Sequence, residues 1–250
     1  TSLNAAPAIF TFGVCLQDLT QRATLWHSHD NQANALVAAR VETNSAIGQL
    51  FNNALTWTGE ITVLDATNIQ CTTRDGGSGS DIVYYLALDL AGTGLDLRTL
   101  TTRTATGNDA ITGVGFQPAL LIESLMKATV VDTLYTNANA NSLQIGAADG
   151  TDEFSSCVVD EDGLTTTDNF SVASSIVIDL DDKQSGTSVN FIDATLSSFD
   201  ADGRTLNYSV VDGTARKGWE LLLEEQAGLS VPQIISMRRR SEPLSPLLQM

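Results

Sequence analysis

Short runs of alternating or β-branched apolar residues recur along most of the chain, separated by clusters of Gly, Asp, Asn and Ser. A period of two residues places apolar side chains on one face of a strand, whereas a helix needs a period of 3.6. These runs therefore predict antiparallel strands joined by tight turns. They lie at residues 61–63, 69–73, 82–88, 143–145, 175–178, 189–191 and 206–210.

Helical patterns are few. Residues 44–55 have a weak apolar period, and residues 215–226 have a better one, with Trp219, Leu222 and Leu223 on one stripe. On this pattern alone, both segments are candidate helices.

An internal repeat changes the second of these interpretations. The segment from Asp65 to residue 86 aligns with the segment from Asp200 to residue 223, at an offset of 135 residues that becomes 137 after the turn. Residues 82–86 are β-branched and aromatic, so their counterparts at 219–223 are predicted to form a strand rather than a helix. A weaker match sets Phe12-Gly13 against Ile145-Gly146.

The repeat predicts an all-β fold of two related antiparallel β-sandwich-like units followed by an extended C-terminal arm. The first unit spans residues 1–92 and the second spans residues 115–228. A Thr-rich connector at 93–114 joins them, and residues 229–250 form the arm. Proline disfavours helix at the residue before it, and three of the five prolines lie in the last nineteen residues.

The charge of the chain is divided between body and arm. The net charge is −17, but residues 1–237 hold ten basic and 29 acidic residues, a net of −19, whereas residues 238–250 carry a net of +2. An acidic body repels phosphate, so nucleic-acid and membrane-surface partners are disfavoured. Arginines can pair with carboxylates of a neighbouring subunit while leucines fill a groove. The arm residues predicted to bind partners are Arg238, Arg239, Arg240, Leu244, Leu247 and Leu248.

Candidate catalytic and metal sites are weak. On a strand, His27 and His29 would share one face beside Asp30, which is a plausible beginning of a metal site, but the chain has no further histidine. Calcium at the acidic segments 160–162 or 200–202 is an alternative, although the spacing is not that of an EF-hand. These carboxylates, and those at 179–182, are more simply explained as solvated turns.

No reaction motif stands out elsewhere. The Gly-rich segment around Ser78 lacks the spacing of a nucleophile elbow, and no nucleotide-binding pattern occurs. We therefore expect no catalytic residue, metal or cofactor, and no enzymatic activity.

The cysteines and the N-terminus bear on where the chain is made. Cys15, Cys71 and Cys157 lack paired spacing and are predicted to be buried apolar side chains. No basic segment followed by an apolar stretch opens the sequence, so no secretory signal is expected. No apolar run approaches the roughly 20 residues of a membrane-spanning helix. These observations fit synthesis in a reducing cytoplasm.

Two local motifs have a clear structural meaning. Residues 194–208 predict a hairpin, because the turn Asp200-Ala201-Asp202-Gly203 supplies side-chain acceptors and a glycine that can adopt positive φ. Residues 112–122 predict a glycine-rich bend, with Pro118 at the start of a buried strand.

At these motifs, TGVGFQP at 112–118 and SFDADGRTLN at 198–207, the chain resembles a group of tailed-bacteriophage virion proteins. The resemblance covers residues 110–225 well and residues 8–92 faintly. Arg204 replaces the aromatic residue usual after the hairpin glycine, a departure that concerns the exposed face of the hairpin rather than the fold.

The resemblance implies a non-enzymatic structural component of a virion, either a capsid decoration or cement protein or a tail-associated protein. Such a protein would be made in the host cytoplasm and located in the virion. Its partners would be other virion proteins, capsid or tail subunits, and copies of itself in a homo-oligomer. It would dock on its neighbours through edge strands and the C-terminal arm.

A receptor- or glycan-binding module of a tail fibre is the alternative. Exposed aromatic side chains stack on sugar faces, and the candidates are Trp26, Trp57, Tyr84 and Tyr135. The competing interpretation of each is a core residue.

Overall fold

The computed structural model describes residues 8–28, 38–51, 54–65, 67–76, 90, 92–136, 140–161, 169–184 and 187–225. These residues form an all-β protein in which every strand pairing is antiparallel, and none of them is helical. The described part therefore contains no helix that could span a bilayer.

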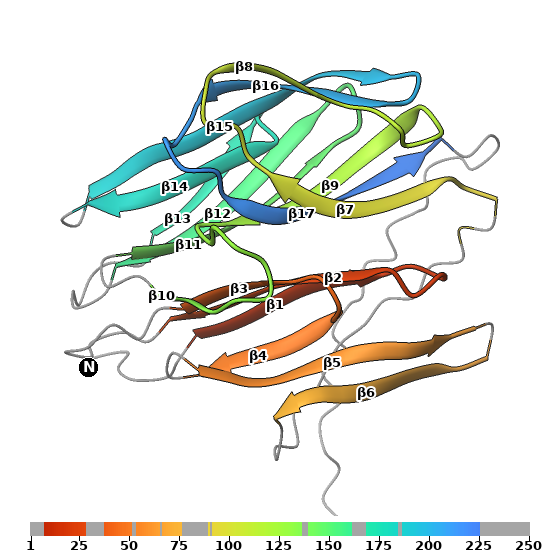
Figure 1. The fold of residues 1–250 in the computed structure, drawn as a ribbon. Helices are drawn as coiled ribbons and strands as arrows, with labels where there is room; N and C mark the ends of the chain where they lie inside the picture. The colour runs from red at the N-terminus through yellow and green to blue at the C-terminus, as the bar shows by residue number, and fades with distance from the viewer. Residues whose placement is uncertain are drawn as a thin grey trace, which may run out of the picture.

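Four sheets build the molecule (Figure 1). The first half of the chain forms two of them. One has the order β1-β2-β3-β10, and the other has the order β4-β5-β6. Their strands are β1 (Ala8–Cys15), β2 (Gln21–Ser28), β3 (Ala38–Glu42), β4 (Ile47–Phe51), β5 (Ala54–Leu64), β6 (Ile69–Gly76) and the short β10 (Tyr135–Thr136), which comes from the second half.

The second half of the chain forms the two larger sheets, with the orders β13-β12-β11-β9-β17-β7 and β14-β15-β16-β8. The strands of the six-stranded sheet are β7 (Leu95–Thr101), β9 (Pro118–Met126), β11 (Ala140–Ala148), β12 (Glu153–Glu161), β13 (Asn169–Ser174) and β17 (Lys217–Glu224). Those of the four-stranded sheet are β8 (Gly107–Ile111), β14 (Ile178–Gln184), β15 (Thr187–Asp200) and β16 (Gly203–Val210).

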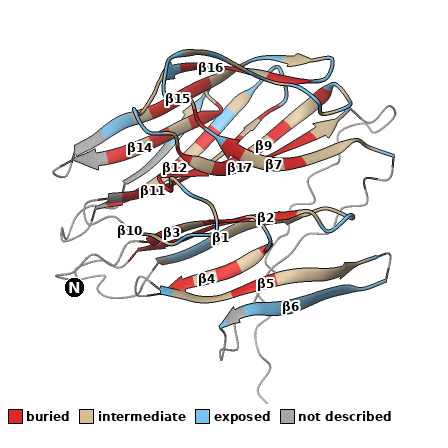
Figure 2. Ribbon diagram, viewed as in Figure 1, coloured by how far each residue is buried: buried red, intermediate tan, exposed pale blue. Residues whose placement is uncertain are grey.

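The sheets are stacked in four layers, with β4-β5-β6 and β14-β15-β16-β8 on the outside (Figure 1). One apolar cluster fills the space inside each sandwich, around Leu25 and Leu50 in the first and around Leu121 and Ile192 in the second. Two further clusters join the inner layers, one of them built on Trp219. Buried residues consequently concentrate in the inner layers, whereas the residues of β6 whose burial is described are all exposed (Figure 2).

The two halves repeat the same arrangement of strands. The set β1-β2-β3 facing β4-β5-β6 corresponds in order and pairing to β11-β12-β13 facing β14-β15-β16. The β5–β6 hairpin has register shifts at Thr58/Gly59 and Ile61/Val63, and the β15–β16 hairpin has them 135 residues later, at Asp193/Ala194 and Leu196/Ser198. β-Bulges reshape a strand pair locally, so bulges at matching positions indicate the same local geometry in both halves.

Two glycines show the same correspondence inside the sandwiches. A Cβ on Gly13 in β1 would collide with the carbonyl oxygen of Ala46, and a Cβ on Gly146 in β11 would collide with that of Val177. Each of these carbonyls belongs to the residue directly before the first strand of the facing sheet. The sequence match at Gly13 and Gly146 thus has a structural cause, which is close approach of backbone from the opposite sheet.

Several elements predicted from the sequence are present. Residues 219–223 lie in β17, as the repeat predicted, and Pro118 is the first residue of β9. Asp200 pairs with Gly203 across the turn of the β15–β16 hairpin. Residues 93–114, described above as a connector, contribute β7 and β8 to the two larger sheets.

Other predictions are wrong. The segment predicted as a helix at 44–55 contains β4 and the start of β5 instead, and Leu50 and Leu55 from these strands pack in the first sandwich core. Of the predicted strand at 175–178, residues 175–177 form the turn before β14, where Ser175 has a φ of 66°, and only Ile178 belongs to β14. Of the cysteines, Cys157 is buried, Cys15 is half-buried and Cys71 is exposed on β6. The predicted strand at 82–88 and the arm lie outside the described residues.

Candidate docking edges

Only part of each histidine and acidic group considered as a metal site at 27–30 and 160–162 lies among the described residues. His27 is buried in β2 with its ring against Phe51, while His29 and Asp30 lie outside the described residues. Asp160 is buried in β12 and Asp162 lies outside the described residues. Within the part of the chain that the structure describes, no three His, Cys, Asp or Glu side chains come close enough to hold a metal ion.

The carboxylates of the hairpin turn accept hydrogen bonds from their own surroundings. Asp202 accepts hydrogen bonds from the backbone N–H groups of Gly113, at 3.0 Å, and Gly115, at 2.6 Å. Asp200 accepts hydrogen bonds from the hydroxyls of Ser198 and Thr205, both at 2.7 Å. These bonds lower the pKa of both carboxyls and tie the bend before β9 to the hairpin.

The carboxylates at 179–182 do not lie on a solvated turn, which corrects the expectation for them. They are part of β14, where Asp179 stands directly opposite Asp193 of β15. Burial, together with Asp181 and Asp193, raises the pKa of Asp179 to about 6. Asp182 is buried and accepts a hydrogen bond from Lys127 Nζ at 2.6 Å.

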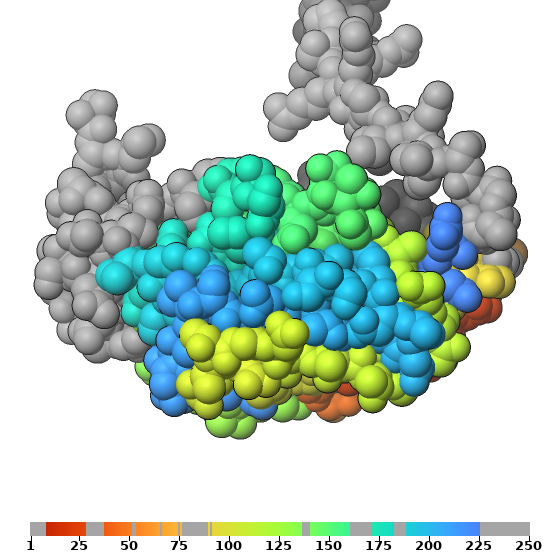
Figure 3. Space-filling view, turned by 90° about the horizontal axis from the view of Figure 1, so that it is seen from above, coloured from red at the N-terminus to blue at the C-terminus, as the bar shows by residue number. Residues whose placement is uncertain are grey.

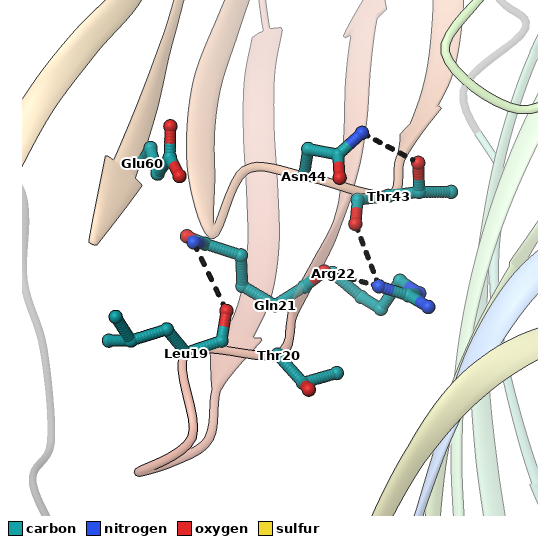
Figure 4. Close-up of a pocket in the computed structure, with 7 residues that line it drawn as sticks. All are labelled: Leu19, Thr20, Gln21, Arg22, Thr43, Asn44 and Glu60. Atoms are coloured by element: carbon teal, nitrogen blue, oxygen red, sulfur yellow. Dashed lines mark hydrogen bonds between the residues drawn. The ribbon is translucent and has the colours of Figure 1, made fainter. Parts of the chain in front are cut away.

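A small polar pocket of about 280 Å³ lies where β2, β3 and β5 meet their connecting turns (Figure 4). Gln21 donates to the carbonyl of Ile61 and accepts from its N–H, and Arg22 donates to the carbonyl of Thr43. Glu60 is the only carboxylate in the lining. The pocket therefore lacks the pair of groups that general acid–base chemistry needs, and its polar side chains hold turns in place.

A charged cluster is buried between the sheets of the second sandwich. Arg204 is fully buried rather than on an exposed hairpin face, because its side chain points from β16 toward the six-stranded sheet. It donates two hydrogen bonds to Glu220 Oε2, at 2.9 and 2.6 Å, and one to Asp109 Oδ2 at 3.3 Å. Glu220 stands directly opposite Glu123 of β9.

The electrostatics of this cluster follow from burial. Glu123 is fully buried, and its desolvation together with the charge of Glu220 raises its pKa well above the ordinary value. The amide of Gln144 donates to Glu123 at 3.2 Å. Burial also raises the pKa of Glu220, which the guanidinium of Arg204 opposes. Arg204, Glu123 and Glu220 are fully buried, so we assign the cluster to the stability of the sandwich.

Of the four aromatic residues considered for glycan stacking, one is buried and two are half-buried. Trp26 is buried between the inner layers, which removes it as a stacking platform. Trp57 and Tyr135 are half-buried, and Tyr84 lies outside the described residues. The outer face of the four-stranded sheet forms a continuous surface of β8, β15 and β16 without a deep hollow (Figure 3).

The first notable surface is the free edge of β1. β1 ends its sheet, and no strand among the described residues pairs with its outer side. Its eight residues carry no charge, and Ile9 and Phe10 are each 39 % exposed. Exposed edges are normally protected by charges, prolines or a covering segment. By comparison, β6, β7, β8 and β14 carry charged residues, and the uncharged β4 and β13 are shorter.

The second notable surface lies on β12 and β13, at one edge of the six-stranded sheet. Phe154 is 47 % exposed and Val172 is 58 % exposed. Because Phe154 pairs with Ser174 and Ser156 pairs with Val172, the two apolar side chains are diagonal neighbours on one face. The face continues into Val158, which packs on the cluster between the inner layers. We refer to Phe154, Ser156, Val172 and Ser174 as the β12–β13 patch.

Sequence reasoning missed both surfaces. The uncharged run at residues 8–15 is typical of a strand and was the available signal for the β1 edge. The exposure of Phe154 depends on how the layers overlap, which the sequence does not show. The predicted partner-binding residues of the arm, Arg238 to Arg240 with Leu244, Leu247 and Leu248, lie outside the described residues.

Comparison with known proteins adds no relative: no family model, no curated protein and no solved structure matches the chain.

Proposed function

We propose that the chain is a non-enzymatic structural component of a tailed-phage virion, a capsid decoration or cement protein or a tail-associated protein. It docks on neighbouring subunits of the particle through edge strands and through its C-terminal arm. The motif resemblance at residues 112–118 and 198–207 supplies the virion context.

The observation that carries the docking role is the β12–β13 patch. Two large apolar side chains, Phe154 on β12 and Val172 on the edge strand β13, are about half exposed, and the six residues of β13 carry no charge. Burying a large apolar side chain contributes about 1.5–3 kcal/mol, so covering two that are half exposed contributes roughly that amount in total. An edge strand adds backbone hydrogen bonds that fix the orientation of the partner.

The charge distribution supports the role of the arm. The body is strongly acidic, whereas residues 238–250 have a net charge of +2. The arginines at 238–240 complement carboxylates on the body of a neighbouring subunit, and charge-assisted pairs of this kind fix geometry as well as contributing energy. Leu244, Leu247 and Leu248 supply apolar anchors next to them.

The test is incorporation of variants into particles, measured as copies per particle by quantitative mass spectrometry of purified virions. Phe154→Lys combined with Val172→Lys is expected to lower occupancy at limiting protein by roughly tenfold, since a loss of about 1.4 kcal/mol changes affinity tenfold. Val130→Lys is the matched control, because Val130 is 55 % exposed and lies outside the patch. The wild-type chain missing from purified particles contradicts the proposal.

A further inference from the structure

Two glutamates in the core of the second sandwich each have one oxygen without a hydrogen-bond partner among the described residues. Glu123 of β9 and Glu220 of β17 are fully buried and stand directly opposite each other across the antiparallel strand pair. Side chains in such positions have Cβ atoms about 4.5–5.5 Å apart, so the two carboxyl groups are within reach of each other. Their protonation states are therefore coupled.

The oxygens that are already bonded show which oxygens remain. Glu123 Oε1 accepts a hydrogen bond from the amide of Gln144 at 3.2 Å. Glu220 Oε2 accepts two hydrogen bonds from Arg204, at 2.9 and 2.6 Å. Glu123 Oε2 and Glu220 Oε1 are the two buried oxygens left over. An ionised carboxylate only accepts hydrogen bonds, whereas a protonated carboxyl also donates one, so a single proton would pair both oxygens.

The charges in contact with the pair also favour one proton. Arg204 supplies one positive charge and shares it with Asp109 through a hydrogen bond of 3.3 Å. Two ionised glutamates would place two negative charges beside it in a fully buried site. Like charges at close range in the interior disfavour the ionisation of both groups. Since Glu220 is the one bonded to the guanidinium, Glu123 is the one that keeps the proton.

Three further groups act on the pair from neighbouring strands. They are Tyr208 of β16, Glu153 of β12 and Arg98 of β7. Arg98 is paired with Asp96, and Glu153 is half-buried, so neither replaces the charge of Arg204. Burial raises the pKa of Tyr208, whose hydroxyl stays neutral and has no hydrogen-bond partner among the described residues. Tyr208 is therefore the competing donor for Glu123 Oε2.

We infer that Glu123 and Glu220 hold one proton between them, as a hydrogen bond from Glu123 Oε2 to Glu220 Oε1, and that this proton is a pH-sensitive lock on the second sandwich. When the proton passes to solvent at alkaline pH, the hydrogen bond is replaced by two negative charges facing each other. β9 and β17 are inner strands of the six-stranded sheet, so the repulsion acts at the middle of that sheet. The raised pKa of both carboxyls agrees with a proton that is kept above their usual range.

Infrared spectroscopy of the full-length chain tests the shared proton, because a protonated carboxyl absorbs at a different frequency from a carboxylate. At about pH 8, far above the ordinary glutamate pKa of about 4.3, the wild type is expected to retain a carboxylic-acid band. Glu123→Gln is expected to remove this band. Glu220→Gln is expected to remove it as well, since Arg204 then neutralises Glu123. Tyr208→Phe is the matched control and keeps the band.

Three results overturn the shared proton. The first is a wild type without a carboxylic-acid band, a result that needs no variant. The second is a band that persists in folded Glu220→Gln, which shows that burial alone keeps Glu123 protonated. The third is loss of the band in folded Tyr208→Phe, which makes the tyrosine the partner of Glu123. The amide band of the β-sheets reports in the same spectra whether each variant is folded.

Raising the pH tests the lock. The wild type is expected to lose its carboxylic-acid band and its β-sheet amide band at the same alkaline pH. Glu123→Gln has no proton to release, and its amide can donate to Glu220, so this variant is expected to keep the sheet band at that pH. A wild-type sheet band that outlasts the carboxylic-acid band, or a variant that loses its sheet band together with the wild type, overturns the lock.

Discussion

Arg204 gives the sharpest test of the energetics of the second sandwich. It is fully buried and donates two hydrogen bonds to Glu220, which is itself fully buried. Glu123 stands opposite Glu220 on the neighbouring strand, and the charge of Arg204 partly opposes the rise in the pKa of Glu123. Arg204→Met keeps most of the side-chain volume but leaves Glu220 without its cation.

The expected cost follows from these contacts. Removing one partner of a buried ion pair costs about 3–5 kcal/mol, because the remaining charge is buried without compensation. Two charge-assisted hydrogen bonds, each of about 1.5–3 kcal/mol, give the same range. Domains of ordinary stability unfold with about 5–15 kcal/mol, so this single change removes a large fraction. Arg204→Met combined with Glu220→Leu is expected to recover most of the loss, since no unpaired charge remains between them.

Urea unfolding followed by tryptophan fluorescence measures the effect, since buried Trp219 lies next to Glu220 in β17. With m-values of about 1–3 kcal/mol/M, the midpoint of Arg204→Met should fall by roughly 1–5 M. Asp109→Asn is the control, because the Asp109 side chain is 27 % exposed and its bond to Arg204 is longer. A midpoint shift no larger than that of the control, or a double variant no more stable than Arg204→Met, refutes the reasoning.

Two further predictions concern close backbone approach and pH. Gly13→Ala and Gly146→Ala should each cost about 1–3 kcal/mol from overpacking against a fixed carbonyl. Gly213→Ala, where a Cβ meets nothing within 4 Å, should stay within about 0.5 kcal/mol, and equal urea midpoints for all three would contradict the interpretation. The raised pKa of Glu123 means that the folded state holds this proton to higher pH than the unfolded state does. Its stabilising contribution is present below the unfolded pKa of about 4.3 and is lost as pH rises through the folded pKa. Glu123→Gln should flatten that decline in a pH series of urea midpoints, and an unchanged slope argues against a buried neutral carboxyl.

Local turn chemistry made part of the fold predictable. The Asp200–Gly203 turn needs a glycine and nearby acceptors, and those residues occur in that order in the sequence. The repeat corrected an amphipathic pattern at 219–223 that would otherwise predict a helix. There the structure shows β17, buried on both faces between two layers, and a strand of this kind carries apolar residues without strict alternation.

Burial between layers was not predictable from the sequence. Arg204 occupies a position that a hairpin in isolation would expose, but the six-stranded sheet covers that face. Trp26 is buried because a second sandwich packs on the back of its sheet. Period and propensity describe one strand at a time, whereas these outcomes depend on which sheet lies above it.

The duplication also explains why the two halves differ at their edges. Both halves place three strands against three strands, with bulges and a glycine at matching positions. The two sheets of each half therefore pack against each other with the same local geometry. The second half then extends its inner sheet by β9, β17 and β7, which cover the far side of β11. The first half stops at β1 within the described residues and exposes an uncharged apolar edge there. An uncharged edge of this kind is open to pairing with an extended chain, whereas the same position in the second half is already paired with β9.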